Sequence, residues 1–213
     1  MLELLIPSLL QTLYMVFFST LFSLVLGFPM GILLVITEKG SIWEKPTLYR
    51  LLDGIINILR SFPFLILMIL LFPLSRLIVG KTIGTTATIV PLSIAAAPFV
   101  ARVIESSLKE VDRGVIELGH SIGASVPQII FKILIPEAMP SLIMGVTLTV
   151  INLIGYSAMA GAIGGGGLGD LAIRYGLYRF QTDVMVAAVI IIVLLVQGIQ
   201  YAGNKLASKI SKK

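Results

Sequence analysis

The chain has 213 residues, of which 57% are hydrophobic and 13% charged, and its mean hydropathy is +1.02. Soluble domains carry roughly 25% charged residues, so this composition excludes an ordinary water-soluble protein. With no cysteine and one histidine, disulfides, thiolate metal sites and iron–sulfur clusters are excluded, and we expect no metal and no cofactor. The net charge of +5 is explained by charges that flank a membrane, so we expect lipid contact and no nucleic acid.

Long stretches without Asp, Glu, Lys or Arg predict an all-α polytopic membrane protein. A helix needs about 20 apolar residues to cross a bilayer. We expect five transmembrane helices, at about 9–36, 55–78, 83–104, 139–161 and 184–203. The second charge-free stretch is short, so its span should begin near Ile55 and have Arg60 at its edge, where a long side chain can reach the interface.

The Lys and Arg residues are distributed unevenly between the two sides of these spans. Of the 16, only Arg76, Lys81, Arg174 and Arg179 lie on one side, while the remaining twelve, including those of the basic tail 205–213, lie on the other. Because cytoplasmic loops are enriched in Lys and Arg, the side with twelve is predicted to be cytoplasmic. The N-terminus is then outside and the C-terminus cytoplasmic.

The first span and its connection contain two local signals. Pro29 lies between Gly27 and Gly31, which predicts a kink and the close approach of a neighbouring helix. Residues 37–54 are expected to form a short cytoplasmic link, with Trp43 at the membrane interface.

The connection at about 105–138 is the longest structured one and should be cytoplasmic. Asp112 is a candidate N-cap for a first short helix, whose apolar face is formed by Val115, Leu118 and Ile122. Gly123 should end this helix, since glycine accepts the left-handed backbone of a C-cap.

A second short helix should begin at Ser125, because serine, proline and Gln128 form a capping-box pattern. The helix should continue through Ile133 toward Pro136. From helix chemistry alone, two interpretations stay open. The insert is either an elbow that returns the chain to the membrane, or an ordered element that binds a partner.

Polar residues in the fourth span recur with helical periodicity. The stripe consists of Gly145, Thr149, Asn152, Tyr156 and Met159, and Ser157 lies one position off it. Because polar side chains in a bilayer face protein or water, the stripe forms either a helix–helix interface or the lining of a translocation path.

The segment 162–182 is expected to be a glycine-rich outer loop. Gly164, Gly165, Gly166 and Gly167 are consecutive, and each glycine costs about 1 kcal/mol in a helix relative to alanine. The run is either a loose turn, or a hinge or close-packed outer gate that serves alternating access.

The insert resembles the EAA loop of bacterial ABC-importer permeases. The shared spacing is formed by Glu117, Gly123, Ile133, Ile135 and Pro136, while the two alanines of the family motif are Leu118 and Gly119 here. The resemblance implies that residues 112–136 contain a coupling helix that binds a cytoplasmic ATPase. It assigns ATPase coupling to Glu117, Gly119, Gly123, Ile133 and Pro136.

Three further segments, 60–64, 89–102 and 155–176, resemble the permeases of methionine ABC importers, and this likeness covers essentially the whole chain. It implies a type I ABC importer permease fold over residues 8–204 in the bacterial cytoplasmic membrane. It also implies a homodimer with two ATPase copies and an extracytoplasmic substrate-binding protein, importing D- or L-methionine. A permease for another small amino acid or solute is the alternative.

Two other functional classes fit the residues less well. A channel or secondary carrier usually has ionisable residues inside the membrane, whereas no Asp, Glu or Lys is expected deep in these spans. An intramembrane enzyme needs a nucleophile–base pair or metal ligands at depth, and a single histidine in a cytoplasmic insert provides neither. We therefore expect ATP hydrolysis to occur in a separate subunit.

Overall fold

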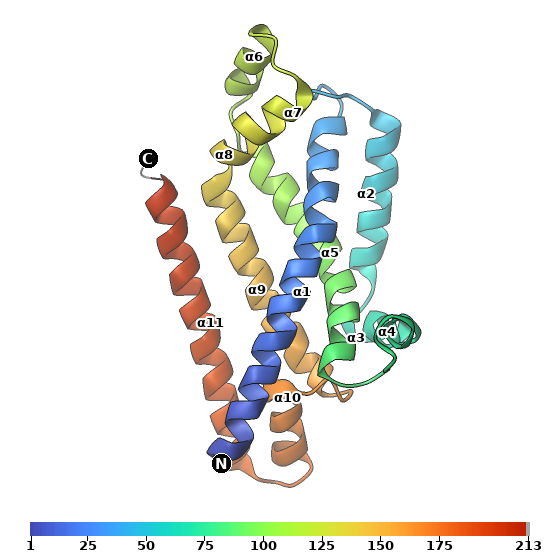
Figure 1. Ribbon diagram of the computed structural model, residues 1–213, viewed down its shortest axis with the longest axis vertical. Helices are drawn as coiled ribbons and strands as arrows, with labels where there is room; N and C mark the ends of the chain where they lie inside the picture. Colours follow the sequence, from blue (N-terminus) through green and yellow to red (C-terminus); the bar gives the residue numbers. More distant parts are fainter. Residues whose placement is uncertain (212–213) are drawn as a thin grey trace.

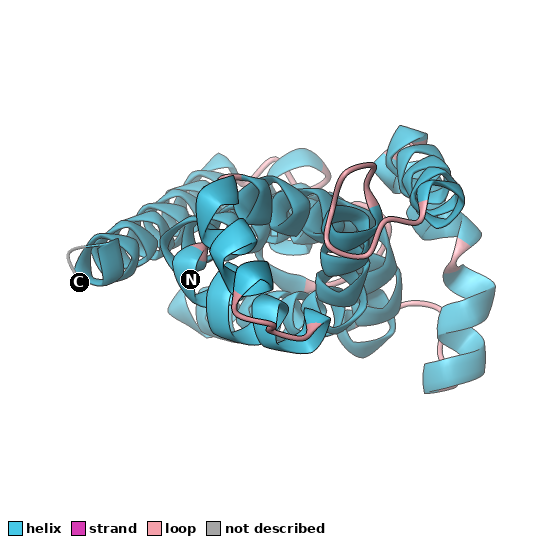
Figure 2. Cartoon of the chain, turned by 90° about the horizontal axis from the view of Figure 1, so that it is seen from above, coloured by secondary structure: helices cyan, strands magenta, loops and turns pink. Residues whose placement is uncertain are grey.

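The computed structural model describes residues 1–211, and all regular secondary structure within this range is helical (Figures 1 and 2). Four helices are long and apolar enough to span a membrane: α1 (Leu2–Thr37), α5 (Thr85–Lys109), α9 (Met139–Gly161) and α11 (Thr182–Ser211). The helices α2 (Pro46–Ser61) and α3 (Phe64–Leu70) meet the same criteria only as a pair, bent by 102°. The helical class is thus confirmed, with five spans only if the bent pair is one of them.

Shorter helices lie at the two ends of the bundle and beside it. They are α4 (Phe72–Val79), α6 (Arg113–Ser121), α7 (Val126–Ile129), the π-helical turn η1 (Ile130–Leu134), α8 (Ile135–Glu137), α10 (Gly167–Leu171) and the π-helical turn η2 (Ala172–Leu177). Figure 1 shows α6 and α7 at one end of the bundle, and α10 with the N-terminus at the other. We call these the insert end (residues 112–136) and the glycine end (residues 161–177).

The second span differs from its prediction. Helix α2 begins at Pro46, because proline suits the first turn of a helix, so the predicted link 37–54 is wrong in its second half. The helix ends before Pro63, where Phe62 is extended with φ −72° and ψ 132°, as expected for a residue that precedes proline. The residues of the predicted span 55–78 therefore do not form one continuous helix, and Arg60 lies near the C-terminal end of α2.

Helix α1 packs directly on α5 through its two central glycines. A Cβ atom on Gly27 would lie 2.6 Å from the carbonyl oxygen of Ala97, and one on Gly31 would lie 2.6 Å from Cβ of Ile104. Such distances leave no room for a methyl group. The predicted close approach of a neighbour around Pro29 is confirmed, and that neighbour is α5.

The insert end has its own part of the hydrophobic core. Buried side chains from α1, α5, α7 and α9 meet there, among them Ile36, Ile104, Leu108, Ile129 and Leu142. In contrast, α11 lies at the edge of the bundle in both views (Figures 1 and 2). Because Ile129 is completely buried, the second half of the insert is anchored in the bundle.

Candidate functional site

Both ends of α6 are stabilised as the sequence predicts. The side chain of Asp112 accepts a hydrogen bond from the backbone N–H of Gly114 at 2.7 Å, which caps the N-terminus. At the other end Gly123 has φ +78°, and the N–H of Ala124 donates to the carbonyl oxygen of Gly119 at 3.0 Å. These are the features of a glycine C-cap.

The second helix of the insert also begins as predicted and then merges with the fourth span. The backbone N–H of Ser125 donates to Oε1 of Gln128 at 2.8 Å. Helix α7 then passes through the π-helical turn 130–134 and α8 toward α9. A Cβ atom on Gly119 would lie 2.7 Å from Cδ1 of Ile133. Two predicted coupling residues are therefore in contact, and Gly119 lets α6 approach the second helix.

The predicted apolar face of α6 is exposed. Val115, Leu118 and Ile122 are 37%, 63% and 76% exposed, so these side chains are not covered by the rest of the chain. The predicted coupling residues Glu117 and Pro136 are exposed as well. A surface of this kind, on a helix whose ends are capped, is typical of a binding site for another protein.

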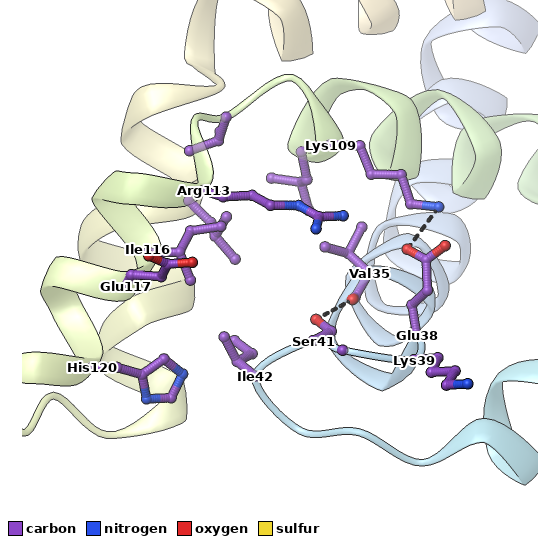
Figure 3. Close-up of a pocket in the computed structure, with 14 residues that line it drawn as sticks. Val35, Glu38, Lys39, Ser41, Ile42, Lys109, Arg113, Ile116, Glu117 and His120 are labelled. Carbon is purple, nitrogen blue, oxygen red and sulfur yellow. Dashed lines mark hydrogen bonds and ion pairs between the residues drawn. The ribbon is translucent and has the colours of Figure 1, made fainter.

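A cavity of about 440 Å³ separates α6 from the segment 38–42 after α1 (Figure 3). Arg113, Glu117 and His120 lie on the α6 side, facing Ser41 and its neighbours. The hydroxyl of Ser41 donates to the carbonyl oxygen of Val35 at 2.6 Å, which holds the segment against α1. The cavity lies between α6 and the bundle, and α6 is attached beside it through Ile116, which packs on the core, and through Gly119.

Next to this cavity, an ion-pair network joins α1, α2 and α5. Arg102 bonds Asp53 and, at 2.7 Å, Glu105, while Lys109 bonds both Glu105 and Glu38 at 2.9 Å. The side chain of Glu105 is only 7% exposed. A buried carboxylate is stable only when paired, so this network fixes the insert end of three helices.

Sequence reasoning missed this network. The spacing of Arg102, Glu105 and Lys109 at i, i+3 and i+7 places them on one face of a helix and could have been noticed. Their partners, however, are Asp53 of α2 and Glu38, the residue that follows α1. No local pattern indicates which carboxylates those helices bring into contact.

The structure divides the predicted stripe on α9 between two surroundings. Gly145 and Thr149 face the protein interior: a Cβ atom on Gly145 would lie 2.2 Å from Cγ1 of Val103, and Thr149 is 1% exposed. Tyr156 stacks on Phe64 with ring centroids 4.3 Å apart. Ser157 is buried and donates to the carbonyl oxygen of Ile154.

The other side of α9 is open. Leu148 and Met159 are 48% and 44% exposed, and Asn152 is half-buried. Gly155 is exposed, and a Cβ atom added to it would meet nothing within 4 Å. These positions are spaced at helical intervals, so they form one exposed face. Asn152 and Met159 of the predicted path belong to this face, whereas Gly145 and Thr149 belong to the contact with α5.

The segment 162–182 is not the loop that was expected. It contains α10 and η2, which together cover residues 167–177. Gly164, Gly166 and Gly167 have φ angles of +85°, +80° and +81°, so they turn the chain sharply before α10. The glycines form a tight turn because other residues rarely adopt this backbone.

Close backbone packing continues on both sides of this turn. A Cβ atom on Gly161 would lie 2.2 Å from the backbone nitrogen of Asp170, and one on Gly169 would lie 2.3 Å from the carbonyl oxygen of Ala158. Helix α1 supplies the caps: Gln11 accepts from the N–H of Gly167, and Thr12 from the N–H of Leu168, each at 2.9 Å. The glycine end is therefore closely packed.

The predicted site residues thus form three groups that do not meet. The coupling residues lie at the insert end and the glycine run lies at the opposite end (Figure 1). The predicted path residues belong to α9, which connects the two ends. The fold is that of a multi-span helical membrane protein with one ordered insert between its spans, a class that includes transport permeases.

Comparison with known proteins supports this class. Residues 23–202 match the family described as binding-protein-dependent transport system inner membrane component. The chain belongs to this family, and it is a multi-pass protein of the bacterial inner membrane.

Similar proteins are known in several bacteria. The chain is 48% identical, over 99% of its length and 94% of the relative's, to the probable D-methionine transport system permease protein MetI of Vibrio cholerae. It is 46% identical, over 85% of its length and 82% of the relative's, to the methionine import system permease protein MetP of Bacillus subtilis.

A solved structure has the same fold. An inward-facing conformation of the MetNI methionine ABC transporter matches with a TM-score of 0.97 and 44% identity, over 99% of this chain and 97% of the other. An amino acid ABC transporter crystallised with histidines matches with a TM-score of 0.73, over 99% and 94% of the two chains. At 21% identity, the second match is evidence for the fold alone.

Proposed function

We propose that this chain is the permease subunit of an ATP-driven importer of methionine, in its D or L form or both. Two copies form the translocation path, and each binds a separate ATPase subunit through α6. A substrate-binding protein delivers the amino acid from outside. ATP hydrolysis takes place in the partner, and the permease alternates between outward- and inward-facing states.

The observation that carries this proposal is the exposed apolar face of α6. Val115, Leu118 and Ile122 are the exposed part of a helix that is capped at both ends. The helix that follows continues into α9, the helix with the predicted path. A partner that moves α6 would therefore act on α9 through the contact of Gly119 with Ile133 and the short turn at Gly123, which join α6 to the helical segment that continues into α9.

The distribution of charge supports the orientation that coupling needs. The insert end lies on the side with twelve of the sixteen Lys and Arg residues, which favours the cytoplasm. The glycine end is then outside, where a binding protein delivers substrate. The exposed α9 face with Asn152, Gly155 and Met159 is the surface we assign to the path between two copies.

The choice of methionine is supported by similar proteins. The two relatives and the solved structure that share 44% or more identity with this chain are all named for methionine transport. Reconstitution tests it directly. The permease, its ATPase and its binding protein are placed in liposomes, and methionine uptake is measured with and without ATP. ATP-dependent accumulation is expected. Uptake without ATP would contradict an importer, and ATP-driven uptake of other solutes only would contradict methionine.

The role of α6 is tested by Leu118→Glu. Leu118 is 63% exposed, so the fold should persist, while a charge on the apolar face should abolish ATPase binding. We expect at least a tenfold loss of ATP-driven uptake and loss of copurification with the ATPase, because burying an unpaired charge in an interface is costly.

The matched control is Leu206→Glu, which places the same charge at an exposed leucine of α11 (55% exposed), outside residues 112–136. This variant should transport normally. Full uptake by Leu118→Glu would show that α6 is not the coupling element.

A further inference from the structure

A second cavity lies at the break between α2 and α3. Its volume is about 190 Å³, and its lining includes Arg60, Phe62, Phe64, Ala95, Phe99 and Tyr156. These residues come from four helical elements, and the break at Pro63 makes room for them. One cationic side chain thus shares a cavity with four aromatic rings.

The cavity lies near the middle of a membrane span. Ala95 and Phe99 are close to the centre of α5, which runs from Thr85 to Lys109 and meets the criteria for a span. Arg60 is the penultimate residue of α2, so about 21 Å of helix separates it from Pro46, at 1.5 Å per residue. Arg60 therefore lies at the end of α2 that adjoins α3, and not at its Pro46 end.

Arg60 has no ion pair with any residue in the range 1–211 that the structure describes. Arg102 of α5, in contrast, is bonded to Asp53 and Glu105. A guanidinium at the depth of hydrocarbon is costly unless it faces water or an anion. Since Arg60 is exposed on the protomer, it faces a water-filled path or a bound anionic group.

The aromatic walls suit a thioether. Tyr156 and Phe64 are stacked with their ring planes 10° apart, so they form a firm surface beside Arg60. Phe62 and Phe99 add two more rings to the lining. Methionine sulfur makes favourable contacts with aromatic rings, and arginine binds carboxylates through two parallel hydrogen bonds.

We propose that this cavity is a substrate site within the membrane. Arg60 binds the carboxylate of the transported amino acid, and the four rings contact its apolar thioether side chain. This rests on the proposed function, because it takes methionine as the cargo. The volume is below the roughly 300 Å³ of drug-sized pockets, which suits a single amino acid. No Asp or Glu lines the cavity, so the carboxylate rather than the ammonium is selected by charge.

Transport kinetics give the first test. In liposomes that contain permease, ATPase and binding protein, Arg60→Gln should raise the KM for methionine at least tenfold, because charge-assisted hydrogen bonds to the substrate are lost. Arg60→Lys keeps the charge without the paired donors, so its KM should be intermediate. The control is Arg76→Gln, an exposed arginine of α4 that does not line the cavity; its KM should equal the wild-type value.

Cysteine labelling gives a test that needs no binding protein. The chain has no cysteine, so Ala95→Cys introduces a single thiol into the cavity of the purified permease–ATPase complex. Methionine should slow its reaction with a water-soluble maleimide, whereas methioninamide, which lacks the carboxylate, should not. Ser208→Cys, exposed on α11, should react at the same rate with either compound.

The outcomes separate the site from the function. Normal KM in Arg60→Gln, or equal protection of Ala95→Cys by methionine and methioninamide, would overturn the site while leaving the importer intact. Absence of ATP-driven methionine uptake by the wild type would overturn the proposed function, and with it the assignment of the cavity to methionine.

Discussion

The two ends of the bundle are held together by opposite means. At the glycine end, backbone packs on backbone: Gly161 and Gly169 admit no Cβ atom, and side chains of α1 cap α10. At the insert end, long charged side chains connect the helices, and α6 is attached over a cavity with its apolar face uncovered. One end is built to be rigid, and the other leaves a surface for a partner.

This difference bears on where the protomer can move. A turn of four glycines invites interpretation as a hinge, but a hinge requires room for the backbone to rotate. Glycine is required at these positions because neighbouring backbone and side-chain atoms fill the space that a side chain would occupy. Of the alternatives for the glycine run, a close-packed element therefore fits better than a loose turn or a hinge, and its role as an outer gate stays a prediction. The stability of each end can be measured separately.

The largest effect is expected for Gly161→Ala. The new methyl group would lie 2.2 Å from the backbone nitrogen of Asp170, and backbone cannot move aside as a side chain can. Overpacking of this kind costs about 3 kcal/mol, measured as a lower unfolding temperature of the purified protein. The control is Gly198→Ala in the middle of α11, where nothing lies within 4 Å. There the same change should be neutral or stabilise by up to about 1 kcal/mol.

If Gly161→Ala were as stable as Gly198→Ala, the glycine end would be a loose turn, and the contrast between the two ends would disappear.

A smaller effect is expected for Arg102→Met at the insert end. The change leaves Asp53 and Asn57 without a bond that Arg102 donates, and it removes one partner of the buried Glu105. Breaking a partly buried ion-pair network should cost about 2 kcal/mol, while Lys109 still pairs with Glu105. Chemical unfolding in detergent would measure the loss.

The matched change is Arg174→Met at the glycine end. Arg174 pairs with Asp170 at 2.5 Å, but its side chain is 58% exposed. Such pairs contribute about 0–1 kcal/mol, so the unfolding midpoint should hardly move. Equal losses in the two variants would show that the network does not hold the insert end together.

The sequence was sufficient wherever a local signal decides the structure. Helix α6 begins after Asp112 and ends before Gly123, as predicted from these two capping residues. The predicted span 139–161 has the same bounds as α9. Each of these depends on neighbours in the chain: a capping side chain, a glycine with left-handed backbone, or a run of apolar residues between polar ends.

The sequence-based predictions failed where contacts between residues distant in the chain determine where a helix begins. Counting charges placed the start of the second span after Asp53, whereas α2 begins at Pro46 and Asp53 is paired with Arg102 of α5. No local pattern shows that this carboxylate has a partner 49 residues away. The helix at 167–177 was missed because Gly167 cannot cap itself, and its caps come from Gln11 and Thr12, 156 residues away.

The smallest effect is expected for Gly123→Ala, at the end of α6. Gly123 has φ +78° and nothing within 4 Å of a Cβ atom, so the cost is backbone strain alone, about 1 kcal/mol. Because one face of α6 is exposed and another borders a cavity, the strain should open α6 locally without lowering the unfolding temperature. Hydrogen exchange at Ala124, whose N–H donates to the carbonyl oxygen of Gly119, should become about fivefold faster. Gly123→Asn should exchange more slowly than Gly123→Ala, since asparagine tolerates this backbone. A lower global unfolding temperature in Gly123→Ala would instead show that α6 is as firmly part of the core as the glycine end.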